Sequence, residues 1–420
     1  MVTTTDRLLP LAAVIKASAR LKGIVQRTPL LEYPELAKDY HCRLWLKRED
    51  LQIVRSYKIR GAYNRISQLQ ADERKAGVVC ASAGNHAQGV AYACRELNIQ
   101  GTIFMPNPTP RQKVKKVQSF GGEWVDIVIT GDTFDEAYEA AKEHREVHGS
   151  AFVHPFDDPE VMAGQGTVGL EILADMHEPI DYVFVPIGGG GLSAGLGSYL
   201  KRVQPGIKII GVEPAGAPAM YRSRQANHPV KLDKIDKFVD GAAVQQVGGH
   251  TFEVCQEALD EVVLVPEGKV CSTILELYNE EAIVAEPAGA LALAALDQFK
   301  AQIKGKNVVC VLSGGNNDIM RMEDIKERSL LYEGLKHYFL IRFPQRAGAL
   351  RDFLNHVLGP NDDIAHFEYT KKNNRETGPA LVGIEVEKSE DYDALLRRME
   401  QHRVNYEVLN DKPMLFQMLV

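Results

Sequence analysis

The clearest sign of a fold class in this 420-residue chain is the segment Tyr182-Val183-Phe184-Val185-Pro186-Ile187-Gly188-Gly189-Gly190-Gly191-Leu192. An apolar, β-branched run comes first, four glycines follow, and a helix-like segment continues from Ser193. This order predicts a buried strand, a tight loop and a helix, which is the repeating unit of α/β proteins. A glycine loop lets the backbone approach an anion closely, and its N–H groups together with the helix dipole can bind a phosphate.

The segment from residue 76 to residue 212 alternates between strand-like and helix-like runs. Strands are expected at 78–82, 102–105, 124–130, 151–155, 182–186 and 208–212. Helices are expected at 85–97, 111–120, from the Asp132-Thr133 cap to His148, at 159–176 and at 193–203. Such alternation predicts an α/β fold with mainly parallel sheets and crossover helices on both faces. Binding sites in these sheets lie at the carboxyl ends of the strands.

The sequence after residue 325 has a different pattern. Residues 322–335 predict a charged linking helix, and strands are then expected at 337–343, 364–370, 380–387 and 406–409, with helices at 347–358 and 389–402. The order strand-helix-strand-strand-helix-strand is the ferredoxin-like α+β pattern. We therefore predict two regions, 1–325 and 326–420, with a smaller lobe of about residues 55–160 inserted in the larger lobe of the first region.

Composition and charge disfavour several functional classes. A net charge of −7, with no block rich in Lys and Arg, argues against nucleic-acid binding. No apolar run approaches the roughly 20 residues that cross a bilayer, and residues 1–6 lack the features of a signal peptide. The six cysteines show no metal-like pairing, as expected for reduced thiols in a cytosolic core. We predict a cytoplasmic protein with no metal site and with no nucleic-acid or membrane partner.

Three further segments carry candidate functional side chains. Lys58 lies in a turn before a helix that is expected to begin near Arg60, with Arg55 on its other side. Nearby cations and desolvation would both lower the pKa of its amine. Ser82-Ala83-Gly84-Asn85-His86 and Ser313-Gly314-Gly315-Asn316 each directly follow an apolar, strand-like run. Both segments are therefore expected at strand ends, as the glycine loop is.

Together with the glycine loop, these motifs resemble those of fold-type II pyridoxal-phosphate enzymes, and more closely those of biosynthetic threonine dehydratases (threonine ammonia-lyases). The resemblance covers nearly the whole chain, with the motifs in the family's order. It implies a two-lobed catalytic region with pyridoxal 5'-phosphate on Lys58, Asn85 at the ring hydroxyl and Ser313 facing the pyridine nitrogen. The cofactor phosphate would then lie in the loop of Gly188, Gly189, Gly190, Gly191 and Leu192.

The same resemblance suggests roles for the second motif. The substrate carboxylate would bind at a helix N-terminus, where N–H groups favour anions, on the segment Ser82, Ala83, Gly84, Asn85 and His86. A helix-capping or supporting role is favoured for His86, because Lys58 already fills the proton-transfer role. Glu286 also resembles a family position near the cofactor, and no chemistry is assigned to it.

The reaction that the resemblance implies is a β-elimination that converts L-threonine to 2-oxobutanoate and ammonia, the first committed step towards isoleucine. Lys58 would carry the cofactor and then remove the α-proton; the β-hydroxyl would leave, and the released enamine would hydrolyse. A hydroxyl such as that of Ser313 does not force the pyridine nitrogen to be protonated, so the ring is a weaker electron sink and elimination is favoured over transamination. L-serine is a second candidate substrate.

Several alternatives stay open. Catabolic serine/threonine dehydratases share the catalytic motifs but usually lack a C-terminal module, and another fold-type II β-eliminase is a further alternative. Cysteine synthase and threonine synthase share the fold, but their motifs fit this sequence less closely. Serine racemases that resemble this chain have a proton-transferring serine at the position of Ala83, and a second metal-binding acid at that of Ala219, beside Glu213. We therefore expect neither racemase activity nor a strong metal requirement. A sensing scaffold with a vestigial catalytic half is disfavoured because no catalytic motif is degraded.

A dinucleotide site is a further alternative. Gly189-Gly190-Gly191-Leu192-Ser193-Ala194 fits the dinucleotide fingerprint, and Glu213 lies 24 residues after Gly189, about where a ribose-binding acid is expected. This hypothesis is disfavoured because it leaves Lys58, Asn85 and Ser313 unexplained.

The tail contains two segments that resemble regulatory modules. The turn Gly348-Ala349-Leu350 resembles that of ACT-like ligand-sensing domains, and Phe367-Glu368-Tyr369 resembles the regulatory region of threonine dehydratases. This implies an allosteric enzyme with an amino-acid effector, for which isoleucine is the candidate; an accessory dimerisation domain is the alternative. Longer relatives carry two such modules, whereas this chain has room for one. By resemblance we also expect a homotetramer.

Overall fold

The computed structural model describes residues 6–369 and 376–420, and the chain forms two compact units that divide between Asp318 and Ile319. The domain boundary expected at residue 325 and the bounds of the inserted lobe remain predictions. Within the described ranges, no helix is long and apolar enough to cross a membrane.

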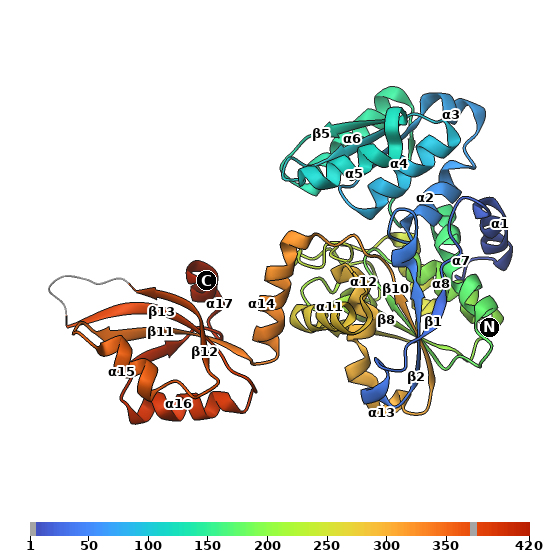
Figure 1. Cartoon of the computed structure of the whole chain (residues 1–420). Coiled ribbons are helices and arrows are strands. Elements are labelled where there is room, and N and C mark those ends of the chain that lie inside the picture. Colours follow the sequence, from blue (N-terminus) through green and yellow to red (C-terminus); the bar gives the residue numbers. More distant parts are fainter. Residues whose placement is uncertain (1–5, 370–375) are drawn as a thin grey trace. The chain divides into compact units, whose positions relative to one another are not determined.

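The larger sheet of the first unit has six strands in the order β1-β2-β10-β7-β8-β9. Figure 1 labels β1, β2, β8 and β10 of this sheet. β1 pairs antiparallel with β2, and the other neighbours pair in parallel. Because β7 and β10 are parallel neighbours, their carboxyl ends meet at one edge of the sheet. The strands are β1 (Leu30–Glu32), β2 (Arg43–Arg48), β7 (Tyr182–Pro186), β8 (Lys208–Pro214), β9 (Glu261–Val265) and β10 (Asn307–Leu312).

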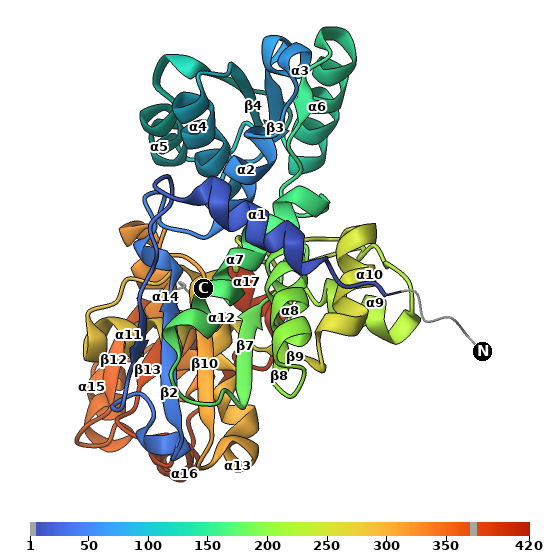
Figure 2. The same ribbon diagram turned by 90° about the vertical axis from the view of Figure 1, so that its right-hand side faces the viewer.

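The smaller sheet of the first unit has four parallel strands in the order β5-β4-β3-β6. Helices α4 and α5 cover one face and α6 covers the other (Figures 1 and 2). Alternation along β3 explains this, since Val78 and Cys80 join the core under α4 while Val79 and Ala81 pack against α6. The strands are β3 (Val78–Ala81), β4 (Gly101–Met105), β5 (Val125–Ile129) and β6 (Ala151–Phe152).

The helices of this unit follow the strands along the chain and confirm the predicted α/β class. Thr133 caps α6 as expected, because its hydroxyl accepts a hydrogen bond from the amide of Glu136 at 3.2 Å. The helices are α1 (Leu11–Leu21), α2 (Lys58–Ile66), α3 (Ala71–Ala76), α4 (Asn85–Leu97), α5 (Arg111–Gly121), α6 (Phe134–His148), α7 (Pro159–Asp175), α8 (Gly191–Val203), α9 (Ala219–Ala226), α10 (Gly249–Ala258), α11 (Glu267–Glu281), α12 (Pro287–Ala294) and α13 (Lys300–Ile303).

Several element boundaries differ from the sequence predictions, for example β13, expected at 380–387 and found at Thr377–Glu385, and three of the differences lie at the motifs. α2 begins at Lys58 instead of near Arg60, and α8 begins within the glycine loop, at Gly191. The strand expected at 151–155 is limited to β6, Ala151–Phe152. The amide of Val153 still donates to the carbonyl of Val79, but beyond it the carbonyls bond to side chains: that of Val153 to His86 and that of Pro155 to Lys58. Pro155 also has no N–H to donate to a ladder.

The second unit contains a four-stranded antiparallel sheet in the order β12-β13-β11-β14, which confirms the predicted α+β pattern. α15 begins directly after Gly348, at the turn that the sequence indicated. The C-terminal helix α17 was not predicted. The elements are α14 (Met322–Tyr332), β11 (Lys336–Pro344), α15 (Ala349–His356), β12 (Asp363–Tyr369), β13 (Thr377–Glu385), α16 (Asp391–Gln401), β14 (Tyr406–Val408) and α17 (Pro413–Leu419).

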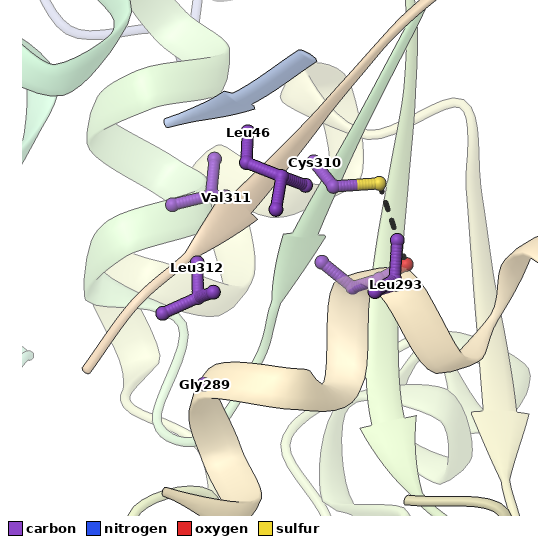
Figure 3. A pocket seen from close by; sticks show the side chains of 7 residues that line it. Leu46, Gly289, Leu293, Cys310, Val311 and Leu312 are labelled. Carbon is purple, nitrogen blue, oxygen red and sulfur yellow. Dashed lines mark hydrogen bonds between the residues drawn. The ribbon is translucent and has the colours of Figure 1, made fainter. Parts of the chain in front are cut away.

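A small void lies between α12 and strands β2 and β10 (Figure 3). It is too narrow for a water molecule, and its lining includes Leu46, Leu293 and Val311. The Cys310 thiol donates to the carbonyl of Ala292 at 3.7 Å at its edge. This void is therefore a packing defect in the apolar core and not a binding site. The Ser313 turn follows the end of β10, at Leu312.

Candidate active site

Lys58 is half-buried at the first position of α2. Its amine donates a hydrogen bond to the carbonyl oxygen of Pro155 at 2.8 Å. Burial lowers the pKa of Lys58 to about 8, and the nearby carboxyl of Glu286 opposes that shift. The flanking arginines are not the cause, contrary to expectation, because the guanidinium of Arg60 is turned into the protein and paired with acids there.

A buried network of charges holds the helix that carries Lys58. The guanidinium of Arg60 bonds to Glu49 through Nε and Nη2, both at 2.8 Å, and to Glu171 at 2.7 and 2.9 Å. Lys47 of β2 reaches the same Glu171 carboxylate at 2.6 Å. The network joins β2, α2 and α7. The sequence did not predict this network, because Glu171 is far from its partners along the chain.

The turn after β10 is tied to the turn before Lys58. The amide of Tyr57 donates to the carbonyl of Ser313 at 3.2 Å, and the amide of Gly315 donates to the carbonyl of Arg55 at 2.9 Å. The buried Ser313 hydroxyl donates to the carbonyl of Ala288 at 3.2 Å. Two motifs that are distant in sequence therefore form one backbone-bonded structure at the carboxyl edge of the larger sheet.

The glycine loop lies at the same sheet edge, between β7 and α8. Gly190 has a φ of +94°, and a Cβ atom at Gly189 would lie 2.2 Å from ring atoms of Phe156. Among the described residues, the amides of residues 188–191 find no hydrogen-bond acceptor. These N–H groups and the N-terminus of α8 form a cradle suited to a phosphate. Leu192 is buried in the first turn of α8.

The segment from Ser82 to His86 leads from β3 into α4. The Ser82 hydroxyl accepts from the amide of Gly84 at 3.2 Å, and Ala83 is half-buried beside it. The ring of His86 hydrogen-bonds the carbonyl of Val153 at 2.8 Å. Burial, followed by the charge of Lys58, lowers the pKa of His86 to about 3, so the ring is neutral and donates to that carbonyl. This geometry is that of a supporting residue.

Asn85 is part of a hydrogen-bonded cluster with two residues that the sequence singled out without a role. Its Nδ2 donates to Glu286 Oε1 at 2.6 Å, and its Oδ1 accepts from Asn316 Nδ2 at 2.7 Å. Burial, with a smaller contribution from Asp240, raises the pKa of Glu286 to about 7. Glu286 and Asn316 each lie in a motif that the sequence indicated. Their contacts with Asn85 could not be predicted, because the residues are more than 200 positions apart in the chain.

Glu213 has a local structural role. Its buried carboxylate accepts from the amides of Met220 and Tyr221 at 2.7 and 2.8 Å, at the start of α9. Burial raises the pKa of Glu213 to about 8. A carboxyl group whose two oxygens accept from a helix N-terminus in this way is not available to a ribose, which removes the main support for the dinucleotide hypothesis.

The residues present fit pyridoxal 5'-phosphate. An amine with a lowered pKa suits an aldehyde, and the open amides of the glycine loop suit a phosphate. The hydroxyl of Ser313 can donate to or accept from a pyridine nitrogen. All three groups lie on segments that the backbone bonds and the strand order bring to one sheet edge.

Residues 21–314 match the family model described as "Pyridoxal-phosphate dependent enzyme". The chain belongs to this family of pyridoxal-phosphate-dependent enzymes. Residues 327–419 of this family member also match the model described as "C-terminal regulatory domain of Threonine dehydratase". The family and cofactor expected from the sequence are thereby confirmed.

Proteins similar to this pyridoxal-phosphate-dependent enzyme include threonine dehydratases and a serine racemase. It is 57% identical over 415 residues to "L-threonine dehydratase biosynthetic IlvA" of Bacillus subtilis (strain 168), covering 99% of this chain and 98% of the relative. A solved structure of processed threonine deaminase isoform 2 from Solanum lycopersicum is 41% identical, with a TM-score of 0.72 over 76% of this chain and 88% of that one. Maize serine racemase is 31% identical, with a TM-score of 0.71 over 77% and 98%.

Proposed function

We propose that this pyridoxal-phosphate-dependent enzyme is a biosynthetic L-threonine dehydratase that forms 2-oxobutanoate and ammonia. The observation that carries the proposal is the half-buried amine of Lys58, with its pKa near 8, on a turn bonded to that of Ser313. The 57% identity to a biosynthetic threonine dehydratase over 99% of the chain supports the choice of substrate.

Lys58 has two tasks in this proposal. When bound, the cofactor supplies an aldehyde that joins to amines and a ring that withdraws electrons from the substrate's α-carbon. The Lys58 amine holds the cofactor until the substrate amine replaces it, and Nζ then accepts the α-proton. With a pKa of about 8, a far larger fraction of the freed amine is unprotonated near neutral pH than for an ordinary lysine, and this fraction is available as that base. The carbonyl of Pro155 orients Nζ.

The other residues bind and orient. The amides of the glycine loop and the N-terminus of α8 hold the cofactor phosphate, and the N-terminus of α4 from Ser82 to His86 holds the substrate carboxylate. Asn85 bonds the ring hydroxyl. The hydroxyl of Ser313 faces the ring nitrogen without forcing it to be protonated, which favours elimination over transamination.

The identity of residue 83, an alanine, argues against racemase activity. Racemisation needs a second acid–base group on the opposite face of the substrate from Lys58, and an alanine side chain cannot transfer a proton. The solved maize serine racemase is 31% identical to this chain, so the fold alone does not decide between the two reactions. The residue at position 83 favours the dehydratase.

The second unit is proposed to bind an amino-acid effector. Its match to a threonine dehydratase regulatory domain supports this, and isoleucine, the end product of the pathway, is the candidate. The segment of β12 with Phe367 and Tyr369 is the candidate effector region; both aromatic side chains are partly exposed, at 36% and 40%. A homotetramer and a cytoplasmic location belong to the same proposal.

The test is release of 2-oxobutanoate from L-threonine by the purified holoenzyme, with and without L-isoleucine, and with L-serine as a second substrate. Production that isoleucine suppresses is the expected result. Production that is indifferent to isoleucine would keep the reaction and contradict the effector assignment. No product from L-threonine by protein that carries the cofactor would contradict the dehydratase assignment.

A further inference from the structure

Helix α5 of the smaller sheet reaches the loop that follows Ser313 in the larger sheet. Lys116 of α5 donates from Nζ to Asn316 Oδ1 at 3.0 Å. One turn earlier on the same helix, Lys113 pairs with Asp240 at 2.8 Å. Both lysines dock α5, but only Lys116 contacts the cluster that contains Asn85.

The contacts of Asn316 leave one orientation for its side-chain amide. Its Nδ2 donates to the carbonyl of Val54 at 2.8 Å, and its Oδ1 accepts from Lys116. A carbonyl oxygen can only accept, and an ammonium group can only donate. A flipped Asn316 would place its oxygen against the Val54 oxygen and its amide nitrogen against the Lys116 amine. The two neighbours therefore set which atom of Asn316 faces which way.

The orientation of Asn316 is passed to Asn85. The second N–H of Asn316 Nδ2 points to Asn85, at 2.7 Å from Oδ1, so Asn85 must present its oxygen there and its Nδ2 on the other side. One N–H of Asn85 Nδ2 goes to Glu286 at 2.6 Å. For the other N–H, the described part of the chain offers no acceptor. One donor of Asn85 is thus left for a ligand.

Glu286 does not set this orientation by itself. Burial raises its pKa to about 7, so its carboxyl group is partly protonated near neutral pH. A protonated carboxyl group can donate and a carboxylate can accept, so Glu286 can bond either the oxygen or the nitrogen of an amide. The orientation of the Asn85 amide is therefore set by its hydrogen bond with Asn316.

We propose that Lys116 and Asn316 are positioning residues that fix the side-chain amide of Asn85, so that its remaining N–H is offered to the ring hydroxyl oxygen of the cofactor. Neither residue is assigned a contact with cofactor or substrate. The inference rests on the proposed function, which places that ring oxygen beside Asn85. Beyond that function, we infer that the orientation of the Asn85 amide depends on Lys116 of α5, which acts through its hydrogen bond to Asn316.

The test compares holoenzymes of the wild type with Asn85→Ala, Asn316→Ala, Lys116→Met and the double variant Asn85→Ala/Lys116→Met. The readouts are the near-ultraviolet and visible absorption bands of the bound cofactor and the separate values of kcat and KM. Asn316→Ala and Lys116→Met should change the position or relative intensity of the bands in the same direction as Asn85→Ala. They should lower kcat by roughly ten- to a hundredfold, with a smaller change in KM. The double variant should match Asn85→Ala alone.

Two matched controls separate orientation from docking. Lys113→Met removes the neighbouring contact of α5 and only a weaker charge effect on Glu286, so it should change the bands much less than Lys116→Met does. Lys116→Arg keeps a donor at the same place and should restore most of the wild-type spectrum. Thermal unfolding of every variant shows that the fold is kept; if Asn316→Ala does not fold, Lys116→Met decides, because methionine preserves the aliphatic stem.

Wild-type bands in both Lys116→Met and Asn316→Ala would overturn the inference, as would equal effects of Lys113→Met and Lys116→Met, or additive effects in the double variant. Each of these outcomes leaves the proposed function in place. A wild-type protein that shows no cofactor band at all would instead overturn the proposed function, and the inference with it.

Discussion

The amine of Lys58 lies 2.8 Å from the carbonyl oxygen of Pro155, a residue of the irregular segment that follows β6. The same segment provides the carbonyl of Val153 for His86 and the ring of Phe156 that packs on the glycine loop. A short stretch of chain without regular structure thus contacts three of the four motifs that the sequence indicated. Because β6 ends at Phe152, residues 153–156 are free to make these contacts in the site.

The first prediction concerns the pH dependence of cofactor attachment. Because burial lowers the pKa of Lys58 to about 8, its nucleophilic form accumulates as the pH rises through that value. The rate at which pyridoxal 5'-phosphate joins the cofactor-free protein, followed by absorbance, should rise up to about pH 8 and then level off. A rate that keeps rising towards about pH 10, as for an ordinary lysine, would contradict the assignment.

The second prediction concerns Glu286 and stability. Its pKa is raised to about 7, whereas the unfolded chain releases the same proton near the ordinary value of 4.5. Between these two values the folded state binds more protons, so this group makes stability fall as the pH rises. Glu286→Gln should flatten the pH dependence of thermal unfolding of the cofactor-free protein between about pH 5 and 7. Equal slopes for variant and wild type would refute the shift.

The third prediction concerns the buried network around Arg60. Glu171→Ala leaves the charges of Arg60 and Lys47 without one of their partners inside the protein, which should cost about 3–5 kcal/mol of unfolding free energy. Chemical denaturation of the cofactor-free chain measures this.

The matched control for that variant is Glu139→Ala. It breaks the surface pair with Lys142, whose side chains are 64% and 45% exposed, and should cost less than about 1 kcal/mol. Similar costs for the two variants would show that the buried network contributes no more than a surface pair.

Much of the site was predictable because its motifs follow strands. The glycine loop and the Ser313 turn each come after a continuous apolar run, and such runs mark buried parallel strands whose ends share one edge. The strand Tyr182–Pro186 and the helix Asn85–Leu97 were predicted with the bounds that the structure shows. Local patterns of this kind are set by burial and chain geometry, which a sequence records directly.

Other features depend on contacts between distant segments, and these were missed. Lys47, Glu49, Arg60 and Glu171 form a buried network of charges, and none of the sequence motifs indicated it. The lowered pKa of Lys58 was expected partly from neighbouring arginines and arises from burial instead. Ion pairs between residues that are far apart in the chain, such as Arg60 and Glu171, depend on how the helices pack. The periodicity of a single segment does not predict that packing.

The most direct measurement is the rate of 2-oxobutanoate release from L-threonine by the wild type and by Lys58→Ala, each incubated with pyridoxal 5'-phosphate. We expect turnover and a visible cofactor band in the wild type, with loss of both in Lys58→Ala, while thermal unfolding shows that the variant is folded. Near-normal release of 2-oxobutanoate by folded Lys58→Ala would contradict the central claim that this lysine holds the cofactor and moves the α-proton.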